Sequence, residues 1–253
     1  MSESEPLLRL RDVTKRFDGV VALNGIDVDV GSGELLGLIG PNGAGKSTLI
    51  NIITGVLPLT DGHIEYDGEP IAGSSVSEIA STGVFRTFQD QMHFDEFTSY
   101  ENLEVANIEN RVLRLDTYLS ALRTGGPDDG VDIGHVIGLI GLSDEQLSKT
   151  PPNMTQIELT KLAIGRALVG DPELLMLDEP FAGLTSEETN EISEIVHRIH
   201  DSGTTILVID HNVGKIVDVT ERVIVIDQGE IVATGSGADI VEDERVRSAY
   251  FGE

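Results

Sequence analysis

The sequence contains no cysteine, no tryptophan and few other aromatic residues, with 7 phenylalanines and 4 tyrosines among 253 residues. Without cysteine, the chain cannot form a disulfide, a thiolate zinc site or a thiol nucleophile. No apolar run approaches the roughly 18 residues of a membrane-spanning helix. The acidic N-terminal residues include no apolar stretch of the kind found in secretory signals. We therefore expect a protein of a reducing compartment that does not span a bilayer by itself.

Basic residues are also scarce. Lys and Arg number 17 against 44 Asp and Glu, so the formal net charge at pH 7 is −27. A field of this sign repels nucleic-acid phosphates, and we expect no nucleic-acid partner. Only 5 of the basic residues are lysines, and excess carboxylate with little lysine suits solubility in concentrated salt. The composition predicts a cytosolic, haloarchaeal protein; the alternative is an ordinary acidic protein.

The order of the apolar segments is typical of an α/β fold. Short β-branched or aliphatic runs alternate with longer helical segments, which predicts a mostly parallel core sheet covered by helices. The first two strands, with residues 64–66 behind them, indicate an antiparallel β flank. We expect strands at residues 7–13, 25–30, 34–39, 83–88, 174–177, 205–209 and 223–227. We expect helices after residue 46 and at residues 100–105, 116–122, 133–141, 155–169, 186–202 and 213–219.

Residues 90–165 differ from the rest because they have few strand signals. Within them, residues 124–130 read Thr-Gly-Gly-Pro-Asp-Asp-Gly, which predicts a loop. The length allows one large domain or two small ones. We interpret residues 1–253 as a single domain, with a helical subdomain at 90–165 inserted into the α/β core.

Residues 40–48 read Gly-Pro-Asn-Gly-Ala-Gly-Lys-Ser-Thr and match the pattern G-x-x-x-x-G-K-S/T between a predicted strand and helix. The glycines let the backbone curl so that its N–H groups form an anion cradle. The helix N-terminus and Lys46 add positive charge, and Ser47 is suited to ligate Mg²⁺. The pattern predicts phosphate and nucleotide binding by Gly40, Pro41, Asn42, Gly43, Ala44, Gly45, Lys46, Ser47 and Thr48.

A second motif, Leu-Leu-Met-Leu-Asp-Glu at residues 174–179, is an apolar strand that ends in two carboxylates. Asp178 can hold Mg²⁺ through water beside the phosphate loop, and Glu179 can orient and deprotonate an attacking water. Alone, such a run is more often only a strand terminus. The phosphate loop in the same chain favours the catalytic interpretation.

With these two motifs, the chain from residue 8 to residue 250 resembles an ABC-type ATP-binding cassette. The resemblance implies a P-loop ABC nucleotide-binding domain that hydrolyses ATP with Mg²⁺. It implies that adenine stacks on Phe17 and that Gln89, in Arg-Thr-Phe-Gln, contacts Mg²⁺ and the water. It also implies that His211 contacts the γ-phosphate.

The family's L-S-G-G-Q signature loop aligns with Met-Thr-Gln-Ile-Glu at residues 154–158, where both glycines are absent. Ile157 and Glu158 bring a branched side chain and a negative charge towards a phosphate site. In one interpretation the loop is impaired, which favours a heterodimer with a second ABC ATP-binding subunit over a homodimer. In the alternative, Thr155 and Glu158 form a capping box and Glu158 turns away from phosphate.

Residues 83–89, 97–103 and 244–252 resemble the ATP-binding subunit of branched-chain amino acid importers. This resemblance implies membrane permease subunits, an indirect link to a substrate-binding protein, and a peripheral position at the cytoplasmic face of the membrane. Urea importers and exporters of lipid or polysaccharide share much of the pattern and remain alternatives.

Met92, Phe94 and Phe97 are candidates for an apolar groove that receives a permease helix, or else they are core residues. Two other classes of function stay open. One is a nucleotide-binding regulatory module that hydrolyses little, and the other is an ABC ATPase of DNA repair or translation.

Overall fold

The computed structural model describes residues 5–87, 93–113 and 131–251. Its centre is a six-stranded sheet with the strand order β10-β9-β3-β8-β7-β6. Five of these strands run parallel, and β10 is antiparallel to β9. The mostly parallel core sheet is thus confirmed. Its strands are β3 (Leu35–Ile39), β6 (Val84–Arg86), β7 (Leu174–Asp178), β8 (Thr205–Ile209), β9 (Arg222–Asp227) and β10 (Glu230–Gly235).

A separate four-stranded sheet, ordered β2-β1-β4-β5, is antiparallel throughout and confirms the predicted flank. Asp18 and Gly19 both have positive φ, as a two-residue hairpin turn of the I′ type requires. This turn pairs Phe17 with Val20. The strands are β1 (Leu8–Phe17), β2 (Val20–Val30), β4 (Asp61–Tyr66) and β5 (Glu69–Pro70).

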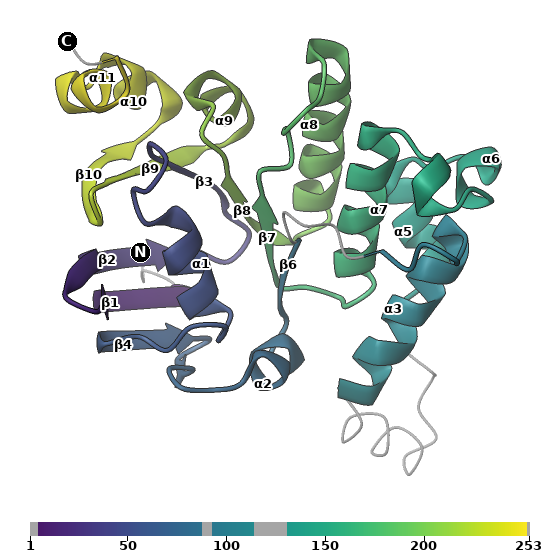
Figure 1. Cartoon of the computed structure of the whole chain (residues 1–253), viewed down its shortest axis with the longest axis horizontal. Helices are drawn as coiled ribbons and strands as arrows, with labels where there is room; N and C mark the ends of the chain where they lie inside the picture. Colours follow the sequence, from purple (N-terminus) through teal and green to yellow (C-terminus); the bar gives the residue numbers. More distant parts are fainter. Residues whose placement is uncertain (1–4, 88–92, 114–130, 252–253) are drawn as a thin grey trace.

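Alternation along the central strands divides the apolar side chains between two cores. Leu36 and Leu38 of β3 pack in the core shared with the antiparallel sheet and α1 (Lys46–Ile53). Leu35 and Ile39 pack in the core shared with the helices on the other face. Figure 1 shows α1 between the antiparallel sheet and the central sheet. The helices of the second core include α8 (Ser186–Asp201), α9 (Val213–Val219), α10 (Gly237–Glu242) and α11 (Glu244–Phe251).

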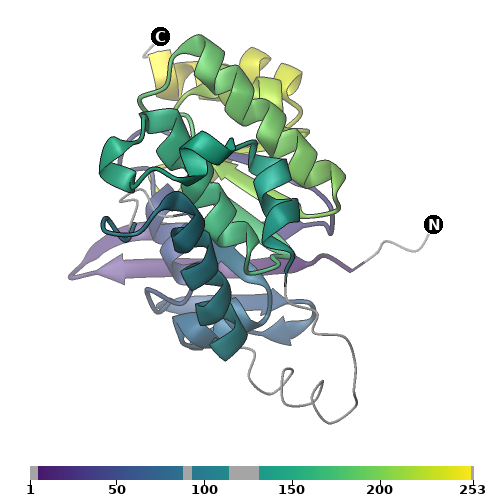
Figure 2. The ribbon, with the colours of Figure 1, turned by 90° about the vertical axis from the view of Figure 1, so that its right-hand side faces the viewer.

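Further helices lie side by side at one end of the molecule, away from the antiparallel sheet (Figures 1 and 2). They are α3 (Ser99–Leu113), α5 (Ile133–Ile140), α6 (Asp144–Leu147), the 3₁₀ turn Pro151–Asn153 and α7 (Gln156–Leu168). The short helix α2 (Val76–Ser81) precedes β6 and contacts α3. The predicted helix at 116–122 and the predicted loop at 124–130 are outside the described residues. Within the ranges that the structure describes, every helix is too short or too polar to cross a membrane.

Candidate nucleotide-binding site

The loop at residues 40–48 leaves the carboxyl end of β3 and enters α1. Gly45 has a φ of 110°, and a Cβ there would lie 2.7 Å from the carbonyl oxygen of Ala22. Gly43 has a φ of 83°, but a Cβ there would meet nothing within 4 Å. Gly45 is therefore required both by its conformation and by close packing, whereas Gly43 lets the loop curl beside open space. Such space on a curled backbone is what a phosphate group needs.

The loop is fastened from behind by two other parts of the fold. The backbone N–H of Gly229, in the turn between β9 and β10, donates to the carbonyl of Ala44 at 2.9 Å. The same residue's carbonyl accepts from the backbone N–H of Asn24 in β2, at 2.8 Å. Both sheets thus hold the loop in place.

Lys46 is buried in the first turn of α1, where its Nζ donates to the carbonyls of Gly40 and Pro41 at 2.6 and 3.2 Å. Burial lowers the pKa of Lys46, and the nearby carboxylates of Glu179 and Asp178 oppose this. The first turn of α1 carries no acidic residue, and the N-cap Gly45 makes no side-chain cap. The positive end of α1 and the Lys46 ammonium group therefore both lie at the phosphate loop, as an anion site requires.

Asp178 and Glu179 lie at the carboxyl end of β7. This strand pairs with β8, which in turn pairs with β3, the strand that leads into the phosphate loop. The backbone N–H of Asp178 donates to Thr87 Oγ1 at 3.2 Å, and that of Glu179 to the carbonyl of Ile209 at 2.8 Å. Glu179 has a φ of 51°, in the left-handed region that few non-glycine residues adopt. Burial raises the pKa of Asp178, and the nearby Arg86 cation opposes the rise.

His211 follows the carboxyl end of β8 and approaches the Glu179 carboxylate. Its Nδ1 lies 3.5 Å from Glu179 Oε1 and 3.4 Å from Asp210 Oδ1. The adjacent parallel strands β7 and β8 thus bring the predicted pair together. Sequence reasoning gave no role to Asp210, although it directly follows an apolar strand. Asp210 is 2% exposed, burial raises its pKa, and its Oδ1 accepts from the N–H of Asn212 at 2.9 Å.

The oxygen donors at this site suit Mg²⁺. One hydroxyl, of Ser47, and one carboxylate, of Asp178, are available at the carboxyl edge of the sheet, and Mg²⁺ in nucleotide sites takes few protein ligands besides phosphate and water. The described residues contain no group of three or more acidic, histidine or cysteine side chains placed for a metal ion.

Phe17 ends β1 at the tip of the hairpin and is 41% exposed. The Nζ of Lys15 lies 4.8 Å from the centre of its ring. The following strand, β2, carries Ala22, whose carbonyl packs against Gly45 of the phosphate loop. The hairpin and the loop therefore adjoin, and part of the Phe17 ring is exposed beside them. Gln89 and Met92 lie outside the described residues.

The segment at residues 154–158 contains the capping box that one interpretation of the sequence required. Thr155 is the N-cap of α7, and its side chain accepts from the backbone N–H of Glu158. Glu158 is 5% exposed and accepts from the backbone N–H of Thr155 at 2.8 Å and from Lys149 Nζ and Gln146 Nε2 at 2.9 Å. Ile157 packs against the helical core, while Gln156 is exposed. The carboxylate is thus directed into the protein.

Comparison with known proteins gave consistent matches. The ABC transporter family model matches residues 23–182. The high-affinity branched-chain amino acid transport ATP-binding protein LivG of Salmonella typhimurium is 35% identical over an alignment of 259 residues that covers 99% of both chains. The corresponding protein BraF of Pseudomonas aeruginosa is 33% identical, again over 99% of both chains. The solved ADP conformation of MJ1267, an ATP-binding cassette of an ABC transporter, is 25% identical with a TM-score of 0.82, covering 99% of this chain and 100% of that one.

Proposed function

Because the chain belongs to the ABC transporter family and carries its ATPase domain, we propose that it binds and hydrolyses Mg·ATP to power the import of branched-chain amino acids. The observation that supports hydrolysis is the meeting of phosphate loop, Asp178, Glu179 and His211 at one edge of the central sheet. The observation that supports this substrate class is 35% and 33% sequence identity, over 99% of each chain, to two ATP-binding proteins of branched-chain amino acid transport.

In the proposed mechanism, the loop N–H groups and Lys46 bind the β- and γ-phosphates of ATP. Ser47, Asp178 and Gln89 would hold Mg²⁺, which would supply the positive charge that neutralises the phosphates. Glu179 accepts a proton from the attacking water, whose oxygen forms the new bond to phosphorus as the bond to ADP breaks.

Two further side chains complete the proposed site. His211 donates to the γ-phosphate and, from 3.5 Å, helps to orient the Glu179 carboxylate. Phe17 presents its exposed ring to the adenine base, and the ring's position at the hairpin tip leaves it accessible. Hydrolysis then releases the contacts that the γ-phosphate made, and the resulting motion drives transport.

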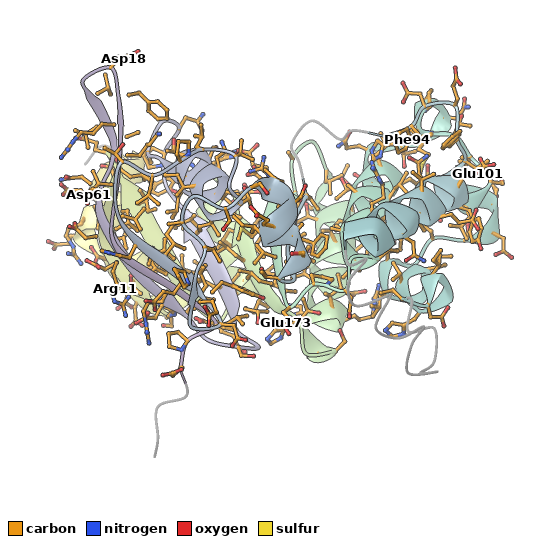
Figure 3. The ribbon with its side chains drawn as sticks, turned by 90° about the horizontal axis from the view of Figure 1, so that it is seen from below. Arg11, Asp18, Asp61, Phe94, Glu101 and Glu173 are labelled. Atoms are coloured by element: carbon orange, nitrogen blue, oxygen red, sulfur yellow. The ribbon has the colours of Figure 1, made fainter. Side chains whose placement is uncertain are left out.

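We further propose that permease subunits dock on the segment that follows Gln89, at the cytoplasmic face of the membrane. Phe94 and Phe97 are 39% and 38% exposed, with ring centres 5.6 Å apart. Arg166 of α7 lies 5.5 Å from the Phe94 ring, and the buried Asn102 bonds both backbone groups of Phe94. Figure 3 places Phe94 and Glu101 at the helical end of the molecule, far from Asp18 in the antiparallel sheet. A rigid, exposed aromatic pair of this kind suits an apolar partner surface.

A second, different ABC ATP-binding subunit is the proposed dimer partner. The two glycines of the signature pattern are replaced by Gln156 and Ile157, so this loop lacks the bare backbone that approaches a phosphate closely. A partner with both glycines would complete the site built on this chain's own phosphate loop. Because Glu158 is buried, its charge is not expected to repel the phosphates of a nucleotide. The absence of both glycines still disfavours close contact between this chain's loop and a phosphate.

The proposal is tested by uptake of radiolabelled leucine, isoleucine and valine in the source organism carrying Glu179→Gln in place of the natural chain. Glu187→Gln, at an exposed position in the first turn of α8, is the matched control. We expect the first variant to lose uptake of these amino acids and the control to keep it. Normal uptake in the Glu179→Gln strain would refute this substrate class, and a loss of urea uptake there would reassign the transporter.

A further inference from the structure

Arg86 lies where β6, β7 and α1 meet, and the proposed mechanism gives this residue no role. It is the last residue of β6, a strand of three residues that, among the residues the structure describes, pairs with β7 at the edge of the central sheet. The next residue, Thr87, donates its backbone N–H to Met176 and accepts from the backbone N–H of Asp178. Arg86 thus stands between the strand that ends in Asp178 and the segment that leads to Gln89, three residues later.

The Arg86 side chain reaches from this strand to the phosphate-loop helix. One guanidinium nitrogen donates to Asn51 Oδ1 at 2.6 Å and lies 3.4 Å from Thr54 Oγ1. Asn51 is in the last turn of α1, and Thr54 is its C-cap. Because α1 has no basic residue of its own in that turn, Arg86 also places a cation at the negative end of the helix.

Arg86 also acts electrostatically on Asp178. Arg86 and Lys46 attract this carboxylate, while Glu179 and Asp210 repel it. Lys46 is the residue that the phosphate of a nucleotide would engage, so Arg86 is the cation that stays with Asp178 when nucleotide binds. In a chain with only 17 basic residues and a net charge of −27, a half-buried arginine between three elements is a costly placement.

We propose that Arg86 is a positioning residue of the ATPase site, which fixes the end of α1 to the strand leading into the Gln89 segment beside Asp178. The phosphate loop leads into one end of α1 and Arg86 bonds the other end, so the phosphate loop and the strand that ends in Asp178 keep a fixed relative position. Arg86 does not touch the nucleotide, and its loss should affect the arrangement needed for hydrolysis more than the binding of ATP.

The test compares ATP binding at equilibrium with the turnover number of the purified transporter assembly. We expect Arg86→Met to lower kcat at least tenfold while the Kd for ATP stays within twofold. Arg86→Lys should recover part of the rate, since it keeps the charge but not the planar guanidinium. Arg198→Met is the control, because Arg198 also bonds a carbonyl between two helices, at Leu139, away from the nucleotide.

A second variant keeps the proposal falsifiable if Arg86→Met does not fold. Asn51→Ala removes only the acceptor on α1, and we expect kcat to fall about threefold with the Kd for ATP unchanged. In the double variant, the rate should be no lower than in Arg86→Met alone, because Arg86→Met already breaks the bond that Asn51→Ala removes. An unchanged kcat in either single variant, or an equal loss in Arg198→Met, would overturn the proposal.

Discussion

Glu158 is expected to stabilise the fold rather than weaken the nucleotide site, and Glu158→Gln tests this. The substitution keeps the size of the side chain but removes the charge that Lys149 approaches at 2.9 Å. Burial alone would raise the pKa of Glu158, but hydrogen bonds from Lys149, the Thr155 N–H and Gln146 outweigh it and hold the pKa at about 2. The buried carboxylate is therefore favoured as an anion.

The expected loss follows from that pKa. A change from 4.5 in the unfolded chain to about 2 corresponds to roughly 3 kcal/mol of stability. Since the folded pKa is the lower one, this contribution is complete above pH 4.5 and is lost as the pH falls through about 2. The amide can still accept from Lys149, so we expect Glu158→Gln to cost about 2 kcal/mol at pH 7 and to lower Tm by roughly 4–8 °C.

Thermal and denaturant unfolding at pH 7 and pH 3, in about 2 M KCl to screen general repulsion, would measure the effect. The difference between the unsubstituted chain and Glu158→Gln should narrow at the lower pH. The control is Glu188→Gln, which removes the same charge from the capping box of α8, whose hydrogen bonds are exposed, and there we expect a smaller loss. Equal stability of Glu158→Gln and the unsubstituted chain at pH 7, or a pH-independent difference, would refute the reasoning.

Three further predictions concern the nucleotide site and the charge of the chain. Gly45→Ala should destabilise the protein by about 1–3 kcal/mol in thermal unfolding without nucleotide, because its φ is 110° and Ala22 is close; Gly43→Ala, with open space around it, should cost less. Glu179→Gln should lower hydrolysis by at least about 10²-fold while ATP binding is retained, and near-normal turnover would exclude Glu179 as the base. Tm should rise with KCl concentration because salt screens the repulsion between carboxylates, and most of the rise should occur below about 1 M, the concentration at which the screening length is about 3 Å. A Tm independent of salt would contradict adaptation to concentrated salt.

Local signals predicted the central elements well. The predicted segments at 205–209 and 213–219 have the bounds of β8 and α9 in the structure. The first is Thr205 followed by an uninterrupted apolar run that ends before Asp210, and the second follows Asn212, whose side chain caps the helix. The phosphate loop was predictable because its glycines, lysine and hydroxyl are close together in the sequence.

Elements that depend on pairing or on packing between distant segments were predicted poorly. The expected strand at 7–13 continues to Phe17 in β1, because residues 15–17, of which Arg16 and Phe17 are exposed, pair with β2 across the Asp18–Gly19 turn. The expected helix at 100–105 is the start of the longer α3 (Ser99–Leu113). The short elements β10, α10 and α11 were missed, and their apolar residues, such as Val246, are buried only against other elements.

The candidate site shows the same limit. The sequence predicted Glu179 and His211, but their approach to 3.5 Å depends on the adjacency of β7 and β8. A capping box between Thr155 and Glu158 was one of two open interpretations, because the sequence spacing allows it. The bonds from Gln146 and Lys149, which bury the carboxylate, depend on the packing of α6 and its following turn near the start of α7.

The central claim is that this chain powers an importer as one of two different ATP-binding subunits. Gentle purification of the tagged chain from its own membranes at high KCl, followed by mass spectrometry of the proteins that accompany it, tests this claim most directly. We predict two permeases and a second, different ABC ATP-binding subunit. Recovery of the chain alone, or with ribosomal or DNA-repair proteins, would contradict the account.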